Sequence, residues 1–405
     1  MKLSILSIKN IASLIGAAGL LAGLPANRAA GQSPPAAGPA ANQADILTAQ
    51  RDVSLRNEVQ HAIDQGLSYL QSSQNSNGWW STADHPAVTA LALSAFMGNP
   101  SAHARERAPE TVERGYRFIL AHAQPDGGIY EKELQNYNTS ICLMALVNAH
   151  KAEYDAVALR ARQWILGQQV AGKETTGSPF DGGVGYGDTG GYSDMNNTLT
   201  ALEALYYSKY LDKDKPLAGA KDLNWPAAIH FIQSCQNLPA YNKESWASDD
   251  PANKGGFIYY PGNTKARAET NAAGRVTLQS YGSISYAGFL SYLYADLKRD
   301  DPRVLAAYDW LRNNFTLEEN PGMGAAGYYY YLHLMSKAMS LYGVNQLGLK
   351  DGKSVDWRKE LALKLINLQK ANGSWANDNG RWWERDPALV TSYSVLALEF
   401  AYRGL

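Results

Sequence analysis

Three aspartates stand directly before stretches that have the composition of helices, and they are the first candidates for acid–base chemistry. Asp194 opens the segment 194–198, DMNNT, while Asp84 and Asp386 each precede a threonine by five residues. If the carboxyls of Asp84 and Asp386 meet, the two can act as a general acid and base pair. Aspartate at such positions also caps helices. We favour the cap and keep the catalytic role as the alternative.

A second group of residues could line a binding site, because they fall in the loops before the same helices or in their first turns. The chain has 25 tyrosines and 10 tryptophans but only 19% charged residues, which indicates wide aromatic surfaces. Such surfaces either pack in the core or line a cavity. The candidates for ligand binding are Asn138, Asn196, Asn197, Tyr281, Tyr328, Tyr331, Trp382 and Trp383.

Several other chemistries find no support in the sequence. The histidines lack HxxxH and HExxH spacings, and neither Cys142 nor Cys235 belongs to a CxxC pair. We expect no metal and no cofactor, two buried thiols with a disulfide as the alternative, and a core role for His333. The net charge is −1 and basic runs are missing, so nucleic acid is not expected as a partner.

The elements that would position these residues recur along the chain. At five places a glutamine follows an aliphatic residue by four and precedes glycine, which is typical of a helix ending in a glycine turn. The glutamines are Gln74, Gln124, Gln169, Gln236 and Gln369. In a sixth, looser copy Phe315 replaces the glutamine. The pattern predicts six units.

A threonine marks the second helix of four units. Thr89, Thr139, Thr198 and Thr391 are each followed six and seven residues later by Ala-Leu or Ala-Phe. These second helices carry few charges, whereas the first helices carry Lys, Arg and Glu. Because one hairpin cannot bury its apolar faces alone, we predict an all-α fold, an α/α toroid of six helical hairpins, with the second helices in the inner ring.

The combination of helix end, glutamine, glycine and tryptophan resembles the QW repeat of squalene–hopene cyclases and related triterpene cyclases. The nearest matches are Gln74 with Trp79 and Gln369 with Trp375. The resemblance, which extends to the β subunits of protein prenyltransferases, implies an α/α toroid in which these pairs clamp neighbouring hairpins.

The same resemblance bears on the chemistry. Triterpene cyclases carry their acid in an Asp-x-Asp-Asp-Thr-Ala motif at the start of an inner helix, where this chain has DMNNTL at 194–199. Asn196 stands at the position of the proton donor, and an amide cannot supply a strong acid proton. The Asp, Cys and His of the prenyltransferase zinc site are not matched either.

The first 51 residues differ from the rest in composition. Lys2 and Lys9 precede a 14-residue, largely apolar run, Ile11–Leu24. Such a run is short for a membrane span and typical of a signal peptide. We predict a signal peptide at 1–30, a Pro/Ala-rich linker at 31–51 and a single toroid domain at 52–405. The mature protein would then be secreted or periplasmic, without a stable membrane span.

Two functions remain open from the sequence. The first is an exported repeat protein that lacks the cyclase acid and the prenyltransferase zinc site, and that binds an apolar or isoprenoid ligand or a protein partner. The alternative is an enzyme on the same toroid. It would be an atypical terpenoid cyclase using Asp194, Asp84 or Asp386, or a hydrolase or lyase that processes glycans.

Overall fold

The computed structural model describes residues 43–101, 108–170, 178–187, 192–212, 222–270 and 276–405. The signal peptide predicted at 1–30 lies outside the described residues. The chain divides between Leu47 and Thr48 into two units, and the following description concerns the unit Thr48–Leu405. No helix in the described part of the chain is long and apolar enough to cross a membrane.

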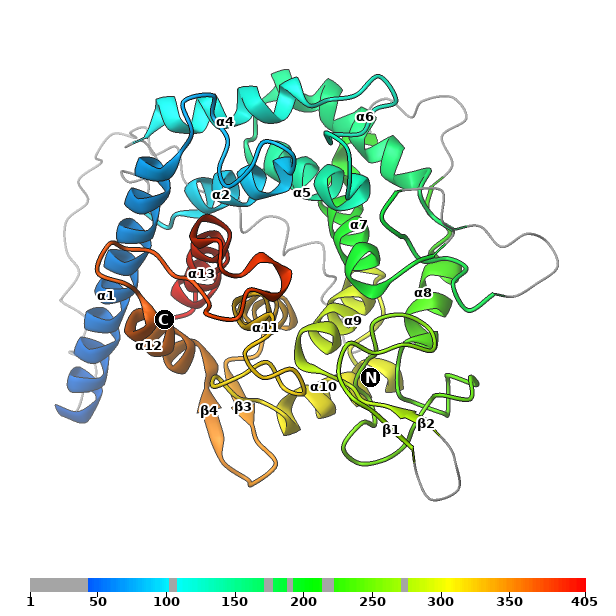
Figure 1. The fold of residues 1–405 in the computed structure, drawn as a ribbon. Helices are drawn as coiled ribbons and strands as arrows, with labels where there is room; N and C mark the ends of the chain where they lie inside the picture. The colour runs from blue at the N-terminus through cyan, green and yellow to red at the C-terminus, as the bar shows by residue number, and fades with distance from the viewer. Residues whose placement is uncertain (1–42, 102–107, 171–177, 188–191, 213–221, 271–275) are drawn as a thin grey trace, which may run out of the picture. The chain divides into compact units, whose positions relative to one another are not determined.

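Twelve α-helices within the described residues form six hairpins, each with an outer helix followed by an inner one (Figure 1). The outer helices are α1 (Gln43–Ser73), α4 (Pro109–Ala121), α6 (Asp155–Leu166), α8 (Trp225–Ser234), α10 (Pro302–Asn313) and α12 (Trp357–Leu368). The inner helices are α2 (Pro86–Gly98), α5 (Gln135–Asn148), α7 (Met195–Tyr207), α9 (Gly282–Tyr294), α11 (Tyr328–Tyr342) and α13 (Pro387–Tyr402). Helix α1 begins at Gln43, inside the range predicted as a linker, where Ala44 and Leu47 are strong helix formers.

The inner helices close into a ring. Each packs against the next in chain order, and α13 packs against α2. The outer helices pack on the outside of this ring. The predicted α/α toroid is therefore confirmed, with the threonine-bearing helices inside. Two small antiparallel hairpins extend from the loops, β1 (Ala268–Thr270) with β2 (Val276–Leu278) and β3 (Gln346–Gly348) with β4 (Ser354–Asp356).

Five of the glycine turns join a hairpin to the next, because only glycine fits there. Gly182 has a φ of +89°, and a Cβ on it would lie 2.0 Å from the carbonyl oxygen of Ala227 in α8. Gly78, Gly127, Gly255 and Gly373 make the same approach to the next outer helix. For Gly373 that helix is α1 of the first hairpin, so the same contact closes the ring.

Four of the five glutamines act as clamps between hairpins, whereas Gln124 bonds the carbonyl oxygen of Tyr130 in its own hairpin. Gln74 Nε2 donates to the carbonyl oxygen of Gly78 in its own turn and to that of Thr111 in α4, both at 2.9 Å. Gln369 Nε2 donates in the same way to Gly373 and to Ala62 in α1. Each clamp thus satisfies carbonyl groups in two hairpins with one amide.

The tryptophan that belongs with Gln74 is Trp80 rather than the predicted Trp79. Trp80 Nε1 donates to the carbonyl oxygen of Leu70 at 2.7 Å, just as Trp375 Nε1 donates to that of Leu365 at 2.8 Å. Trp79 matches Ser374 in the other turn and is only half-buried. The resemblance placed the tryptophan one residue too early because two tryptophans follow Gly78.

The marker threonines have a matching local role. Thr89 Oγ1 accepts from the Trp80 N–H, and Thr391 Oγ1 accepts from the Trp375 N–H, both at 3.1 Å. Thr139 and Thr198 accept from Ile129 and Val184 in the same way. Each of these four inner helices therefore holds the extended segment that follows its own glycine turn.

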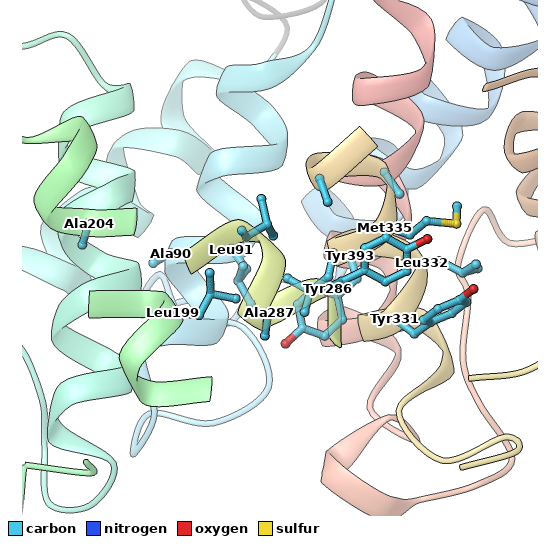
Figure 2. Close-up of a cluster of buried hydrophobic side chains, with 14 of the residues drawn as sticks. Ala90, Leu91, Leu199, Ala204, Tyr286, Ala287, Tyr331, Leu332, Met335 and Tyr393 are labelled. Carbon is cyan, nitrogen blue, oxygen red and sulfur yellow. The ribbon is translucent and has the colours of Figure 1, made fainter. Parts of the chain in front are cut away.

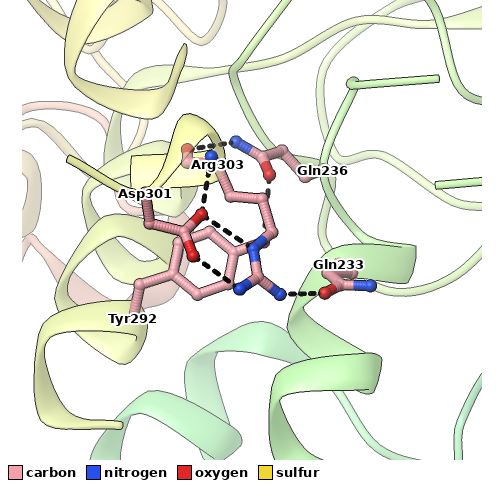
Figure 3. A network of polar contacts seen from close by, with 5 residues as sticks. All are labelled: Gln233, Gln236, Tyr292, Asp301 and Arg303. Atoms are coloured by element: carbon pink, nitrogen blue, oxygen red, sulfur yellow. Dashed lines mark hydrogen bonds and ion pairs between the residues drawn. The ribbon is translucent and has the colours of Figure 1, made fainter. Parts of the chain in front are cut away.

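The contact between the fourth and fifth hairpins adds an ion pair to the clamp (Figure 3). Gln236 Nε2 donates to the carbonyl oxygen of Arg303, and its Oε1 accepts from the Tyr292 hydroxyl at 2.9 Å. The Arg303 guanidinium pairs with Asp301 at 2.6 Å and also bonds Gln233. This network stiffens the start of α10 and lies away from the ring interior.

The ring interior is packed with side chains rather than hollow. Figure 2 shows residues of α2, α7, α9, α11 and α13 meeting in one buried cluster, with Tyr286, Tyr331 and Met335 among them. Polar side chains of α7 and α11 also meet: Lys337 Nζ lies 2.8 Å from a Glu203 carboxylate oxygen. Open space remains mainly where the inner helices begin.

Candidate functional site

All six inner helices begin at the same end of the ring, which we call the mouth, and a cavity of about 320 Å³ lies there. Every inner helix contributes a residue from its first turn. The lining residues are His85, Val88, Leu134, Tyr137, Tyr186, Asn196, Tyr259, Tyr281, Ser283, Ile284, Tyr330, Trp382, Trp383, Glu384, Leu389 and Tyr393. Of the predicted ligand-binding residues, Asn196, Tyr281, Trp382 and Trp383 line this cavity.

Most of the tyrosine hydroxyls at the mouth are bonded to one another or to the wall. The hydroxyls of Tyr137 and Tyr393 lie 3.1 Å apart and link α5 to α13. Those of Tyr186 and Tyr259 lie 2.8 Å apart. In a third pair the Tyr330 hydroxyl donates to Asn196 Oδ1, linking α11 to α7. The cavity therefore presents aromatic faces more than free hydrogen-bonding groups.

The segment Asn377–Asp386, here called the strap, crosses the mouth before α13. Asn377 Nδ2 donates to the carbonyl oxygen of Ala325 at 2.7 Å, and the Trp383 ring lies 4.5 Å from the His85 ring before α2. Trp382 and Trp383 have φ values of +55° and +65°, which are strained for aromatic residues. Both remain exposed, at 44% and 47%.

Glu384 lines the cavity and is absent from the residues predicted from the sequence. Its Oε1 accepts from the Tyr330 N–H at 2.8 Å and its Oε2 from Asn377 Nδ2 at 2.6 Å, so it caps α11 from another hairpin. Burial raises the pKa of this carboxyl, and the hydrogen bonds from Tyr330 and Asn377 oppose the shift. No local sequence signal marks the role, because the helix that it caps lies more than 50 residues earlier.

Asp194 caps α7, in agreement with the favoured interpretation, and does not line the cavity. Its Oδ1 accepts from the N–H groups of Asn196 and Asn197, both at 2.9 Å, and its Oδ2 accepts from Asn197 Nδ2 at 2.7 Å. Burial raises the pKa of this carboxyl to about 6 despite these bonds. These hydrogen bonds hold the predicted ligand-binding residue Asn197 against Asp194, outside the cavity lining.

The other two predicted acids lie outside the cavity lining. Asp386 Oδ1 accepts from the N–H groups of Ala388 and Leu389 and caps α13. It lines an open groove beside Tyr69 and Trp79, on the outer side of the sixth and first hairpins. Asp84 is exposed to solvent. The cavity thus contains neither member of the proposed acid–base pair.

Three further candidates for ligand binding have structural contacts instead. Asn138 Oδ1 accepts from the Ala87 N–H at 3.0 Å and so caps α2 from α5. The hydroxyls of Tyr328 and Tyr331 donate to the carbonyl oxygens of Leu317 and Thr316 in the preceding loop. Tyr330, between them, is the tyrosine of this run that reaches the cavity.

The remaining predicted residues lie in the core. Cys142 and Cys235 are buried free thiols, and the His333 ring stacks on Tyr393 at 5.4 Å between centroids. Within the described residues, no group of three or more His, Cys, Asp or Glu side chains is placed to hold a metal ion.

No family model matches the chain, but solved structures share its fold. One is the type II terpene cyclase MstE from Scytonema, with 13% identity over 86% of this chain and 99% of that chain and a TM-score of 0.51. Another is the α-1,6-mannanase GH76A from Salegentibacter sp. HEL1_6, with 11% identity over 85% and 99% and a TM-score of 0.55.

A third similar structure is the family 76 mannosidase Bt3792 from Bacteroides thetaiotaomicron VPI-5482, at 12% identity over 84% and 98% and a TM-score of 0.50. Identities this low establish a shared fold and not a shared activity. The likeness agrees with a terpenoid cyclase-like α/α toroid.

Proposed function

We propose that the ring binds a small, largely apolar ligand of isoprenoid character between the aromatic faces of its mouth, without protonating it. The paired tyrosine hydroxyls carry this proposal. A ligand recognised by hydrogen bonds would be favoured by unpaired donors and acceptors, whereas the hydroxyls of Tyr137, Tyr186 and Tyr330 each already have a protein partner. The volume of about 320 Å³ is at the lower end of ligand pockets, about 300–1,000 Å³.

The roles of the carboxylates at the mouth support binding over cyclisation. Asn196 lines the cavity where a cyclase would carry its acid, and its amide oxygen accepts from Tyr330. Both carboxylate oxygens of Asp194 accept hydrogen bonds from amide groups at the start of α7. Glu384 is the one carboxylate among the lining residues, and it caps α11.

Calorimetric titration of the purified chain tests the proposal. We expect saturable binding of farnesol and none of α-1,6-mannotriose. Replacing Trp383 by Leu should weaken farnesol binding by about tenfold, because one aromatic wall is lost. The matched control is Trp79→Leu, which removes a half-buried tryptophan outside the cavity and should leave the affinity unchanged. Binding of mannotriose in place of farnesol, or of neither, would overturn the proposal.

Glycan processing is the second candidate, and the exposure of Trp382 and Trp383 is the observation that favours it. The solved structures of similar fold include one of a mannanase variant in complex with α-1,6-mannotriose. Hydrolysis normally needs two carboxyls about 5–10 Å apart, and the cavity lining supplies one. If the chain cleaves mannotriose and Glu384→Gln abolishes cleavage, this candidate replaces the first.

Export belongs to the same proposal. It rests on the basic and apolar composition of residues 1–30. Fractionation of cells expressing the full chain, compared with a chain that lacks residues 2–30, should place only the full chain outside the cytoplasm.

A further inference from the structure

Two buried carboxylates of the ring differ in their partners. Glu203 pairs with Lys337 at 2.8 Å. Glu384 is 1% exposed and forms no ion pair with any described residue; its partners are the Tyr330 N–H and the Asn377 amide. The N-terminus of α11 offsets about half of a unit charge. Part of the negative charge of Glu384 therefore remains uncompensated beside the cavity.

Aromatic rings surround this charge, and the lining contains no Lys or Arg. Six tyrosines, two tryptophans and His85 contribute to the wall. The faces of aromatic rings carry negative electrostatic potential and attract cations within about 6 Å of the centroid. The lining thus combines one carboxylate with many rings and has no Lys or Arg side chain to pair with an anion.

Rings of the mouth already hold cations of the protein itself. Lys265 Nζ lies 4.5 Å from the centroid of the Tyr259 ring, and the Arg381 guanidinium lies 4.3 Å from that of Trp382. Neither basic residue belongs to the cavity lining. These contacts show that the rings at this end of the molecule are placed where a positive charge can reach them.

Asp194 adds negative charge behind the wall. Burial raises the pKa of the Tyr281 hydroxyl, and the charge of Asp194 raises it further, while Arg381 opposes the shift. The influence of Asp194 therefore extends to a ring of the cavity, although its own carboxylate stays bonded to the amides of α7.

We propose that the ligand bound at the mouth carries an alkylated ammonium group, which sits among the aromatic rings close to Glu384. A primary ammonium donates three hydrogen bonds, whereas the lining presents mainly the faces of aromatic rings. A quaternary ammonium has no N–H group and is recognised by aromatic faces alone. The inference rests on the proposed function and narrows its ligand to a molecule with an apolar body and a cationic head.

The test compares choline with 3,3-dimethylbutan-1-ol, its uncharged carbon isostere, by calorimetry on the unaltered chain. We expect choline to bind at least about tenfold more tightly, since the two differ in charge and hardly in shape. If the isostere binds as well as choline, or if farnesol binds and choline does not, this inference fails while the proposed function stands. If none of the three binds, both fail.

Variants of the lining then test whether Glu384 supplies the negative charge that attracts choline. Glu384→Gln should reduce choline affinity by about tenfold and leave that of the isostere unchanged, because glutamine keeps an oxygen for the Tyr330 N–H. The matched control is Asp386→Asn, a cap on the same strap that does not line the cavity, and it should change neither affinity. Should Glu384→Gln fail to fold, Trp383→Leu serves instead and should lower choline affinity more than that of the isostere. Equal losses for both ligands would contradict the inference.

Discussion

Helices α7 and α11 are joined twice across the ring interior, and the two junctions differ in chemistry. At the mouth, Asn196 and Tyr330 meet through a neutral hydrogen bond. Seven residues further along each helix, Glu203 and Lys337 meet as an ion pair. Seven residues are about two helical turns, or about 10 Å. The deep junction neutralises its own charge, whereas the mouth leaves Glu384 without a cation.

This difference shows how one pair of helices serves two purposes. In the closed part of the ring a buried charge must have its partner built into the protein. At the mouth, we propose that a bound ligand supplies the positive charge. Three variants test whether that division holds.

The largest effect is expected at the deep junction. Lys337→Met should destabilise the fold by about 3–5 kcal/mol, because it leaves the Glu203 carboxylate buried without a counter-charge. Urea unfolding would measure the change. The double variant Glu203→Leu, Lys337→Met removes both charges and should recover most of the loss. A loss below about 1 kcal/mol in the single variant would mean that water reaches this part of the ring.

A smaller effect is expected from Asp194, the buried carboxyl behind the wall of the mouth. Burial raises its pKa from 3.8 to about 6. The folded state therefore binds this proton more tightly than the unfolded state, so the contribution to stability is full below about pH 4 and is lost as the pH rises through 6. The difference between the two pKa values corresponds to about 3 kcal/mol.

The variant Asp194→Asn tests whether this contribution to stability is lost as the pH rises. Asparagine keeps the helix cap but cannot titrate. We expect the stability of the unaltered chain relative to the variant to fall between about pH 4 and pH 6, measured as unfolding free energies in urea at several pH values. A relative stability that stays flat or rises over this range would contradict the assignment of a raised pKa to Asp194.

The smallest effect is expected at the neutral junction. Tyr330→Phe should cost about 1 kcal/mol, the net value of one hydrogen bond, because solvent in the cavity can replace the lost partner of Asn196. Tyr137→Phe, which breaks the hydroxyl pair with Tyr393, is the matched comparison and should cost about the same. If Tyr330→Phe matched the loss in Lys337→Met, the contrast between the two junctions would fail.

The toroid could be predicted from sequence because its markers act locally. Gln74 reaches a carbonyl four residues away, and Thr89 bonds a backbone N–H nine residues away. The same local contacts recur in later hairpins, so spacing alone revealed the repeat. The partners across hairpins, such as Thr111 for Gln74, follow once the ring is closed.

The site was harder to predict because its residues act over long separations. Asn138 caps a helix 51 residues earlier in the chain, and Glu384 caps one 54 residues earlier. Neither shows the spacing of a local cap. The four consecutive tyrosines 328–331 show a related difficulty. They point to all sides of one helix, and the sequence does not identify the one that faces the cavity.

The clamp from Gln369 to Ala62 spans 307 residues and has a consequence for engineering. In an open repeat array a unit can be deleted or duplicated, because each unit contacts only its two neighbours and all the contact surfaces are alike. Here the last hairpin must meet the first at a set angle. A chain with five or seven hairpins would leave that amide without its carbonyl, so we expect the number of units to be far less adjustable than their loops.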